Sequence, residues 1–363
     1  MTQPDTDAGA HFQVSHEMAN GTMTPDDDRQ GQRTMRVSVV CPVYNTAPDL
    51  LRAAVRSVLT QSAGDVGQLI LANDCSTDPR TTQALAELAA GDARIIVHRA
   101  DRNGGPARAR NLAMALATSP WVAFLDADDL WLPNHLADAQ AASHAFPAAE
   151  WFACAHLILG PNGAQTAIAL LSDAHAGDPV APGVVRYAPP ASTHALIGNY
   201  WLHLGGCVVK ADLARRAGGF SDRCLYSEDW LFFLCLSTSA DLYFLPAPGY
   251  LLRRQHASLT TSTRRLTRHR ASGKRAALAH PKLTPFKQPL RWALRSTYKG
   301  LAANNVLAGR RIRGSWFALQ AFAMDPREIG EAMQFLRLVA TRDREQMRIR
   351  APAYTSAELT FGD

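Results

Sequence analysis

The stretch Trp121–Asp129, with the sequence WVAFLDADD, decides how the chain is organised. Its five apolar or aromatic residues predict a buried strand, which leads directly into three carboxylates. Carboxylates gathered there repel one another unless a cation is bound, and aspartate suits Mg²⁺ or Mn²⁺ held together with substrate phosphates. In an extended chain Asp126 and Asp128 lie on the same side. We interpret the motif as a metal site beside a nucleotide diphosphate, although so short a motif also matches a plain acidic turn.

The composition is that of a globular protein. Of its residues, 47% are hydrophobic and 19% are charged. The length of 363 residues is enough for one large domain or two smaller ones. No apolar run reaches the roughly 18 residues of a membrane-spanning helix, and the N-terminus lacks the pattern of a secretion signal. The six cysteines include no C-x-x-C pair, which argues against a zinc site or a disulfide framework. We therefore expect a cytoplasmic protein.

Positive charge is concentrated near the C-terminus. The net charge is +6, but residues 264–350 hold 20 Lys/Arg and 5 Asp/Glu, a net of +15, which leaves −9 for the remainder. Such a basic segment predicts an anionic partner. The first candidate is an acidic membrane surface, and an anionic acceptor comes second. Nucleic acid is another anionic candidate of second rank, but we do not expect it as a partner.

Strands and helices alternate over the first third of the chain. Apolar or β-branched runs predict four strands, at 36–41, 68–72, 94–98 and 121–125. Alternation with helices at this spacing predicts an α/β fold with a parallel sheet. Ligands of such sheets bind beyond the carboxyl ends of the strands. Asn45, Asp74 and the Asp126/Asp128 pair follow three of these strands, so we expect them to converge at one edge.

Four motifs in this region share a resemblance. They are VSVVCPVYN at 37–45, LANDCSTD at 71–78, NGGPARARNLA at 103–113 and FLDADD at 124–129. In this order and spacing they resemble the nucleotide-binding half of a family 2 glycosyltransferase, and the resemblance covers about residues 36–260. It implies the GT-A fold, an α/β architecture with a Rossmann-like, mostly parallel central sheet flanked by helices. It also implies an inverting transfer from a nucleotide sugar, usually a UDP-sugar, with a divalent metal.

The first two motifs would surround the nucleoside. By this resemblance the loop formed by Pro42, Val43, Tyr44 and Asn45 borders it, and Asp74 accepts a hydrogen bond from the imide N–H of a uracil. Packing in the core is the alternative role for Tyr44.

The third and fourth motifs would hold the diphosphate and the metal. The resemblance places Asn103, Gly104 and Arg110 along the base and the diphosphate, whereas Gly104-Gly105 could also be only a turn. Asp126, followed by Ala127, would face the ribose and the metal. Asp128 would coordinate Mn²⁺ or Mg²⁺ directly.

A carboxylate pair begins the apolar helix predicted at 231–236. Acidic residues in a first turn are explained equally well by capping and by the helix dipole. In the resembling family, however, the matching Glu-Asp pair carries the catalytic base. We therefore expect Asp229 to be the base, with Glu228 as its support or as the alternative base.

Basic side chains end the strand predicted at 250–256. In the resembling family a histidine or arginine closes over the diphosphate at this position. His256 is expected to be a third metal ligand or a phosphate contact, and a loop histidine without a role is the alternative. Arg253 and Arg254 would stabilise the departing diphosphate.

The expected organisation has four parts: a disordered leader (1–33), a GT-A catalytic domain (34–263), a basic helical C-terminal region (264–350) and a tail (351–363). Residues 160–198 predict a long irregular insertion, where we place acceptor specificity. The helical region is either an appendage with a solvated basic face or a membrane-docking element. The protein would then be cytoplasmic, or peripheral on the inner face of the membrane.

We therefore expect an inverting, metal-assisted glycosyltransferase that moves a sugar from a UDP-sugar to a hydroxyl of a glycan or glycolipid, in polysaccharide or glycoconjugate synthesis. A metal-dependent nucleotidyl or phosphoryl transferase is one alternative, but it would need a second metal site or a basic phosphate loop. A non-catalytic sugar-nucleotide or glycan-binding module is the other, but it would tolerate loss of Asp128 or Asp229, and both are present.

Overall fold

The computed structural model describes residues 34–160, 163, 165–168, 177–198, 201–224, 227–254, 263–325, 330 and 337. The expected leader, the expected tail and His256 lie outside the described residues.

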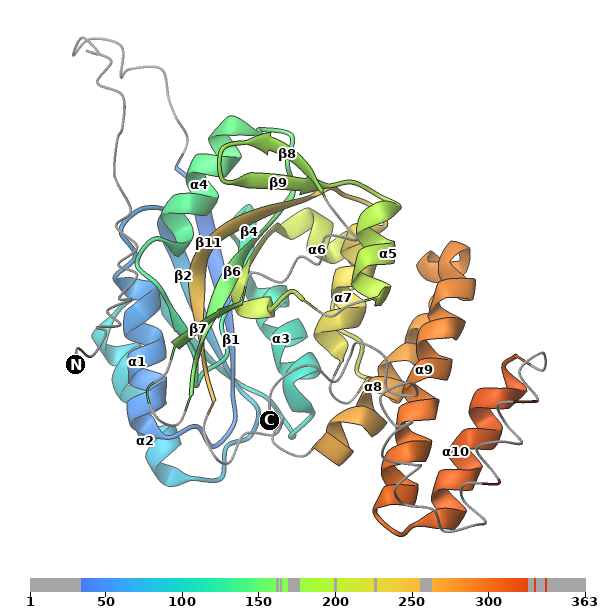
Figure 1. The fold of residues 1–363 in the computed structure, drawn as a ribbon. Coiled ribbons are helices and arrows are strands. Elements are labelled where there is room, and N and C mark those ends of the chain that lie inside the picture. The colour runs from blue at the N-terminus through green and yellow to red at the C-terminus, as the bar shows by residue number, and fades with distance from the viewer. Residues whose placement is uncertain are drawn as a thin grey trace, which may run out of the picture. The chain divides into compact units, whose positions relative to one another are not determined.

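The first four strands form the parallel half of a large sheet. They are β1 (Arg36–Val43), β2 (Asp65–Asn73), β3 (Ile95–Arg99) and β4 (Trp121–Phe124), in the order β3-β2-β1-β4 (Figure 1). The helices between them are α1 (Pro48–Leu59), α2 (Pro79–Gly91) and α3 (Gly105–Leu116). This confirms the predicted α/β alternation. Asn45, Asp74 and Asp126 follow β1, β2 and β4, so all three lie beyond the carboxyl ends of parallel strands.

Beyond β4 the sheet is mixed. Its further strands are β10 (Cys207–Lys210), β6 (Trp151–Leu159), β11 (Leu242–Arg253), β9 (Val184–Tyr187) and β8 (Asp178–Ala181), in that order. Two short strands pair outside this path, β5 (Leu130–Trp131) with β11 and β7 (Gln165–Ile168) with β6. β10 runs antiparallel to both neighbours, whereas β6 and β11 are parallel. The register of β5 with β11 brings the chain after the acidic turn next to Tyr250.

Each face of the sheet has its own core, because alternate strand residues point to opposite faces. On one face α1, α2 and α4 (His135–Ala145) cover residues such as Val39. On the other face α3, α6 (Ala211–Ala217) and α7 (Glu228–Ser237) cover residues such as Val40 (Figure 1). The site described below therefore stands on elements that are fixed from both sides.

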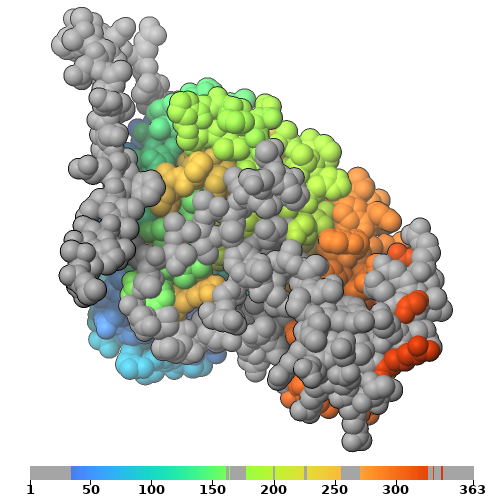
Figure 2. Space-filling view, in the orientation of Figure 1, coloured from blue at the N-terminus to red at the C-terminus, as the bar shows by residue number. Residues whose placement is uncertain are grey.

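The described part of the segment 160–198 is not the irregular insertion that the composition suggested. It contains β7, the antiparallel pair β8–β9, and α5 (Ala191–Gly198). The expectation was wrong because the glycine and proline that suggested a loop form the turn of a hairpin, where Gly183 adopts a φ of 72°. Figure 2 shows this light-green segment on one face of the molecule, beside the orange C-terminal helices.

The expected C-terminal helices are present. They are α8 (Thr263–Ala279), the 3₁₀ helix η3 (Pro281–Phe286), α9 (Lys287–Leu307) and α10 (Arg311–Ala323). Ala277, Leu283 and Leu290 from this region are buried in the same core as α7. None of the described helices combines the length and apolar character needed to cross a membrane.

Candidate active site

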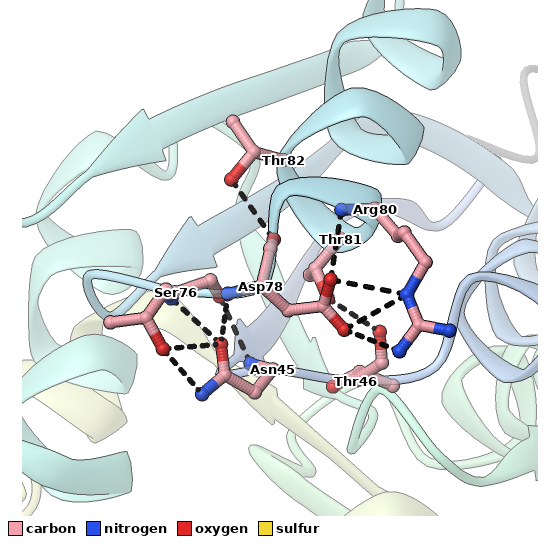
Figure 3. Close-up of polar contacts among 8 residues, drawn as sticks. Asn45, Thr46, Ser76, Asp78, Arg80, Thr81 and Thr82 are labelled. Carbon is pink, nitrogen blue, oxygen red and sulfur yellow. Dashed lines mark hydrogen bonds and ion pairs between the residues drawn. The ribbon is translucent and has the colours of Figure 1, made fainter.

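Asn45 ties the loop after β1 to the loop after β2 (Figure 3). Its side-chain oxygen accepts hydrogen bonds from the backbone N–H groups of Thr77 (2.7 Å) and Asp78 (2.9 Å), and its backbone N–H donates to Ser76 Oγ (3.0 Å). Asn45 adopts a φ of 49°, which asparagine tolerates better than most residues. Tyr44 beside it is 51% exposed, which excludes the alternative that its ring only fills the core. The loop therefore presents Tyr44 to solvent on a fixed backbone.

Asp74 fixes the start of α3. The residue is 3% exposed, and its two carboxylate oxygens accept hydrogen bonds from the N–H groups of Gly104 and Gly105, each at 2.8 Å. Asn103 Nδ2 donates to the Asp74 carbonyl oxygen at 3.2 Å. Gly105 needs its φ of 80° to make this turn. The second and third motifs thus form one unit, held by Asp74.

Arg110 joins two sets of carboxylates. Its Nη2 donates to Asp126 Oδ1 and its Nη1 to Glu228 Oε1, both at 2.7 Å, and Glu228 lies 118 residues further along the chain. The guanidinium is buried, with its carbon 5.4 Å from the centre of the Phe220 ring. Burial opposes the charge, but Asp126 and Glu228 outweigh it and raise the pKa of Arg110. Arg110 was expected along the diphosphate, and the structure places its guanidinium between these two carboxylates.

The pair on α7 is divided by its surroundings. Glu228 is buried and both of its oxygens are engaged, one by Arg110 and the other by the Ser227 N–H (3.0 Å). Asp229 is half-buried, and its Oδ1 accepts a hydrogen bond from the Trp230 N–H at 2.8 Å. The following residues of α7, to Ser237, are all buried, so this first turn is held in place. Of the two carboxylates, Asp229 is the more accessible.

The acidic turn after β4 contains one structural carboxylate. Asp129 is buried and accepts hydrogen bonds from the Tyr250 hydroxyl and from the Arg253 N–H (2.8 Å). Burial and the charges of Asp128 and Asp126 raise its pKa well above the ordinary value. Arg253 was expected at the diphosphate, but its Nε donates to the Asp128 carbonyl oxygen. Asp129 and Arg253 therefore hold the turn against β11.

The other two carboxylates of the turn are available for a cation. Asp128 is exposed, and the Asp126 side chain is 42% exposed. Desolvation and the charge of Asp126 raise the pKa of Asp128. A bound cation relieves the repulsion between the two carboxylates. No three His, Cys, Asp or Glu side chains of the described residues gather into a metal site, and His256 lies outside them. The two carboxylates fit a metal whose remaining ligands are substrate phosphates and water.

The remaining expected residues differ in access. The side chains of Val43 and Ala127 are buried in the core, whereas Pro42 is half-buried and Asn103 and Gly104 are exposed. Val43 and Ala127 can therefore offer a ligand little beyond their backbone.

The sequence analysis did not predict the residues that pack around Tyr250, whose hydroxyl bonds to Asp129 of the acidic turn. The Tyr250 ring packs near His156 and His203, whose ring centres are 4.2 Å apart. Burial lowers the pKa of His156 to about 4 and that of His203 to about 3, so both rings are neutral near pH 7. A Cβ on Gly205 would lie 2.1 Å from the Tyr250 ring, so only glycine fits there. The Gly205-Gly206 pair before β10 was the one sequence signal of this close approach.

The model of glycosyl transferase family 2 matches residues 38–149. The succinoglycan biosynthesis protein ExoW of Rhizobium meliloti (strain 1021) is 30% identical over 226 residues, which cover 59% of this chain and 67% of that protein. The chain belongs to glycosyl transferase family 2.

Other relatives of this family 2 glycosyltransferase are matched over part of their length. An uncharacterized protein, y4gI of Sinorhizobium fredii, is 31% identical over 69% of this chain, which spans 26% of that protein. The putative teichuronic acid biosynthesis glycosyltransferase TuaG of Bacillus subtilis (strain 168) is 43% identical over 28% of this chain and 38% of its own length. Membership of the family favours sugar transfer over the nucleotidyl-transfer and binding-module alternatives.

Solved structures confirm the fold of this glycosyltransferase. S. aureus TarS 1-349 in complex with UDP-GlcNAc superimposes with a TM-score of 0.60 over 91% of this chain and 94% of that chain. The sequence identity is 18%, so this likeness concerns the fold alone.

Proposed function

We propose that this family 2 glycosyltransferase moves a sugar from a UDP-sugar to a hydroxyl group of a glycan or glycolipid, with inversion at the anomeric carbon. One observation carries the proposal: Arg110 bonds to Asp126 and to Glu228, so the acidic turn and the carboxylate pair of α7 face one site. An inverting transfer needs both, because the leaving diphosphate must be stabilised while a base takes a proton from the acceptor.

The donor would lie along the loops after β1, β2 and β3. Tyr44 is exposed beside the first loop, and Asp74 holds the second loop to the start of α3. In our proposal Asp74 also faces the uracil, Asn45 and Pro42 border the nucleoside, and Asn103 and Gly104 lie along the base and diphosphate. TarS has been crystallised with UDP and with UDP-GlcNAc, which supports a uridine donor for a chain of the same fold.

Asp126 and Asp128 would hold Mn²⁺ or Mg²⁺ together with the diphosphate. Such a metal, when bound, offsets the negative charge that develops on the leaving group. Arg110 keeps Asp126 in place, and Asp129 keeps the turn fixed against β11. His256 is proposed as a third contact to the metal or a phosphate.

Asp229 would be the base. Backbone N–H groups at the first turn of α7 favour an ionised carboxylate there. Glu228 is the weaker candidate, because Arg110 and the Ser227 N–H already engage its oxygens. In our mechanism Asp229 accepts the proton of the acceptor hydroxyl, whose oxygen attacks the anomeric carbon from the face opposite UDP. Holding donor and acceptor in line supplies much of the acceleration.

The acceptor is proposed from the relatives and from charge. The names of ExoW and TuaG refer to succinoglycan biosynthesis and teichuronic acid biosynthesis, which supports a glycan or glycolipid acceptor. The basic C-terminal region supports a location on the inner face of an anionic membrane, where a lipid-linked acceptor would be found.

A thermal-shift screen tests the donor and the metal together. UDP-, GDP-, TDP- and CDP-sugars are added with Mn²⁺ or with EDTA, and the unfolding midpoint is followed as ligand concentration rises. A ligand that binds only the folded state raises the midpoint. We expect a UDP-sugar with Mn²⁺ to give the largest rise and EDTA to remove most of it. Equal shifts with all four nucleotides, or with EDTA, would contradict the proposed donor site.

A further inference from the structure

α10 carries apolar residues on two opposite faces. Gly314, Ala318 and Ala321 are buried against the rest of the helical region, and a Cβ on Gly314 would meet Val306 of α9. The opposite face holds Ile312, Trp316 and Leu319, which we call the outer stripe. Their exposed fractions are 90%, 53% and 57%. Spacings of four and three residues place all three side chains on one face of the helix.

The outer stripe is unusual for a helix at a protein surface. A surface helix normally turns an apolar face toward the core and polar side chains toward water. The described residues include six large exposed hydrophobic residues, and three of the six form the outer stripe. Of the other three, Trp292 lies on α9, and Tyr44 and Leu116 lie outside the C-terminal helices. Such a concentration on one helix face marks an interaction surface.

The charge of the helical region, in which Lys274 and Arg295 are buried and other cations are exposed, selects the partner of the stripe. Residues 263–325 contain 14 Lys/Arg and a single acidic residue, Asp325. Arg313 is exposed beside Ile312, and α9 exposes Lys287 and Arg291. A second copy of this chain would bring the same positive charge to the interface and be repelled. A bilayer with anionic headgroups would attract the cations and accept the apolar side chains just below the headgroups.

We propose that the outer stripe of α10 docks on an anionic lipid bilayer, with Ile312, Trp316 and Leu319 in the interfacial layer and Arg313 at the headgroups. Tryptophan favours this layer because its ring is apolar and its N–H is polar. Lipid binding by the stripe does not depend on the proposed function. Only the role that we give to this binding, which is to bring the site to lipid-linked acceptors, rests on that function.

Vesicle flotation tests the docking surface. The full chain is floated with phosphatidylcholine vesicles and with vesicles that also contain phosphatidylglycerol. We expect flotation only with the anionic vesicles, and on the order of tenfold weaker partition for the variant Ile312→Ser, Trp316→Ser, Leu319→Ser. Leu116→Ser on α3, also an exposed leucine, should float like the wild type. Equal flotation of the stripe variant, or none of the wild type, overturns the proposal.

Two further measurements keep the test independent of folding and of catalysis. Brominated lipids quench tryptophans that enter a bilayer, so Trp316→Phe should lose much of the quenching while its unfolding midpoint stays unchanged. Undiminished quenching would place the contact elsewhere. A wild-type dimer that the stripe substitutions dissociate would show that a second copy covers the stripe, contrary to the proposal. Sugar transfer to a soluble acceptor is measured separately, and its failure leaves the vesicle result standing.

Discussion

Carboxylates around the site differ in what they can do because their surroundings differ. Asp74 and Asp129 are buried and hold loops in place, and Glu228 is buried against Arg110. Asp128 is exposed and Asp229 is half-buried. These two and Asp126, whose side chain is 42% exposed, are the more accessible carboxylates, and this division underlies the metal and base roles that we propose.

Asp229→Asn should lower turnover by about 10²–10⁴-fold, the usual contribution of a general base. The amide keeps the shape of the side chain but cannot take a proton, and Asp229 belongs to none of the nucleotide motifs. Affinity for UDP with Mn²⁺, measured by calorimetry, should stay near that of the wild type. Asp222→Asn, an exposed change just before α7, is the matched control and should be neutral. An active Asp229→Asn beside a dead Glu228→Gln would move the base to Glu228.

Arg110→Lys should lower turnover by about 10²-fold. A lysine ammonium cannot donate to Asp126 and Glu228 in the way that a guanidinium does, so the first turn of α7, which carries the proposed base, loses its alignment. UDP affinity should change less than turnover. Arg108→Lys on the same helix, where the arginine bonds to Asp101 near the surface, is the control.

A double-mutant cycle decides how Arg110 acts. If it positions the base through Glu228, then Arg110→Lys should add little to Glu228→Gln, with a coupling of about 0.5–3 kcal/mol. Simple additivity, or a loss of UDP affinity as large as the loss of turnover, would instead assign Arg110 to the nucleotide.

At the scale of elements, the proposed donor side consists of loops that hold one another. Asn45 links the loops after β1 and β2, and Asp74 links the loop after β2 to the start of α3. Each loop follows a different strand, so no single one forms the site alone. Sheet register fixes the strand ends, and these hydrogen bonds then fix the loops.

Asp74→Ala should therefore affect stability and binding together. It removes two hydrogen bonds to a charged group, so the free energy of unfolding should fall by about 1.5–3 kcal/mol. UDP binding should weaken by about 1–3 kcal/mol, because α3 and any uracil contact are both disturbed. Chemical denaturation and calorimetry measure the two. Asp101→Ala, which breaks an exposed pair with Arg108 in the loop after β3, is the control and should leave both quantities near those of the wild type. Unchanged UDP affinity in Asp74→Ala would remove this residue from the donor site.

At the scale of the whole molecule, the C-terminal elements α8, η3 and α9 pack on the helix that carries the candidate base. Buried residues of α8, η3 and α9 share a core with α7, the helix that begins with Glu228 and Asp229. A Cβ on Gly273 of α8 would lie 2.5 Å from Ser227 Cβ, immediately before that pair. Packing is therefore continuous between α7 and these helices, and the domain boundary at residue 264 stays a prediction.

The sequence alone determined the alternation of strands and helices, the family and the four motifs, because hydrophobic periodicity and motif spacing are local properties. The tertiary structure decided which carboxylates are engaged. The Arg110 bridge and the Tyr250–Asp129 contact join positions 118 and 121 residues apart, which no local pattern encodes. The hairpin within 160–198 was missed for a related reason: short strands stabilised by neighbours in the sheet leave little periodicity of their own. Local sequence motifs identified the candidate residues of this site, and long-range packing determined which of their side chains are accessible to a ligand.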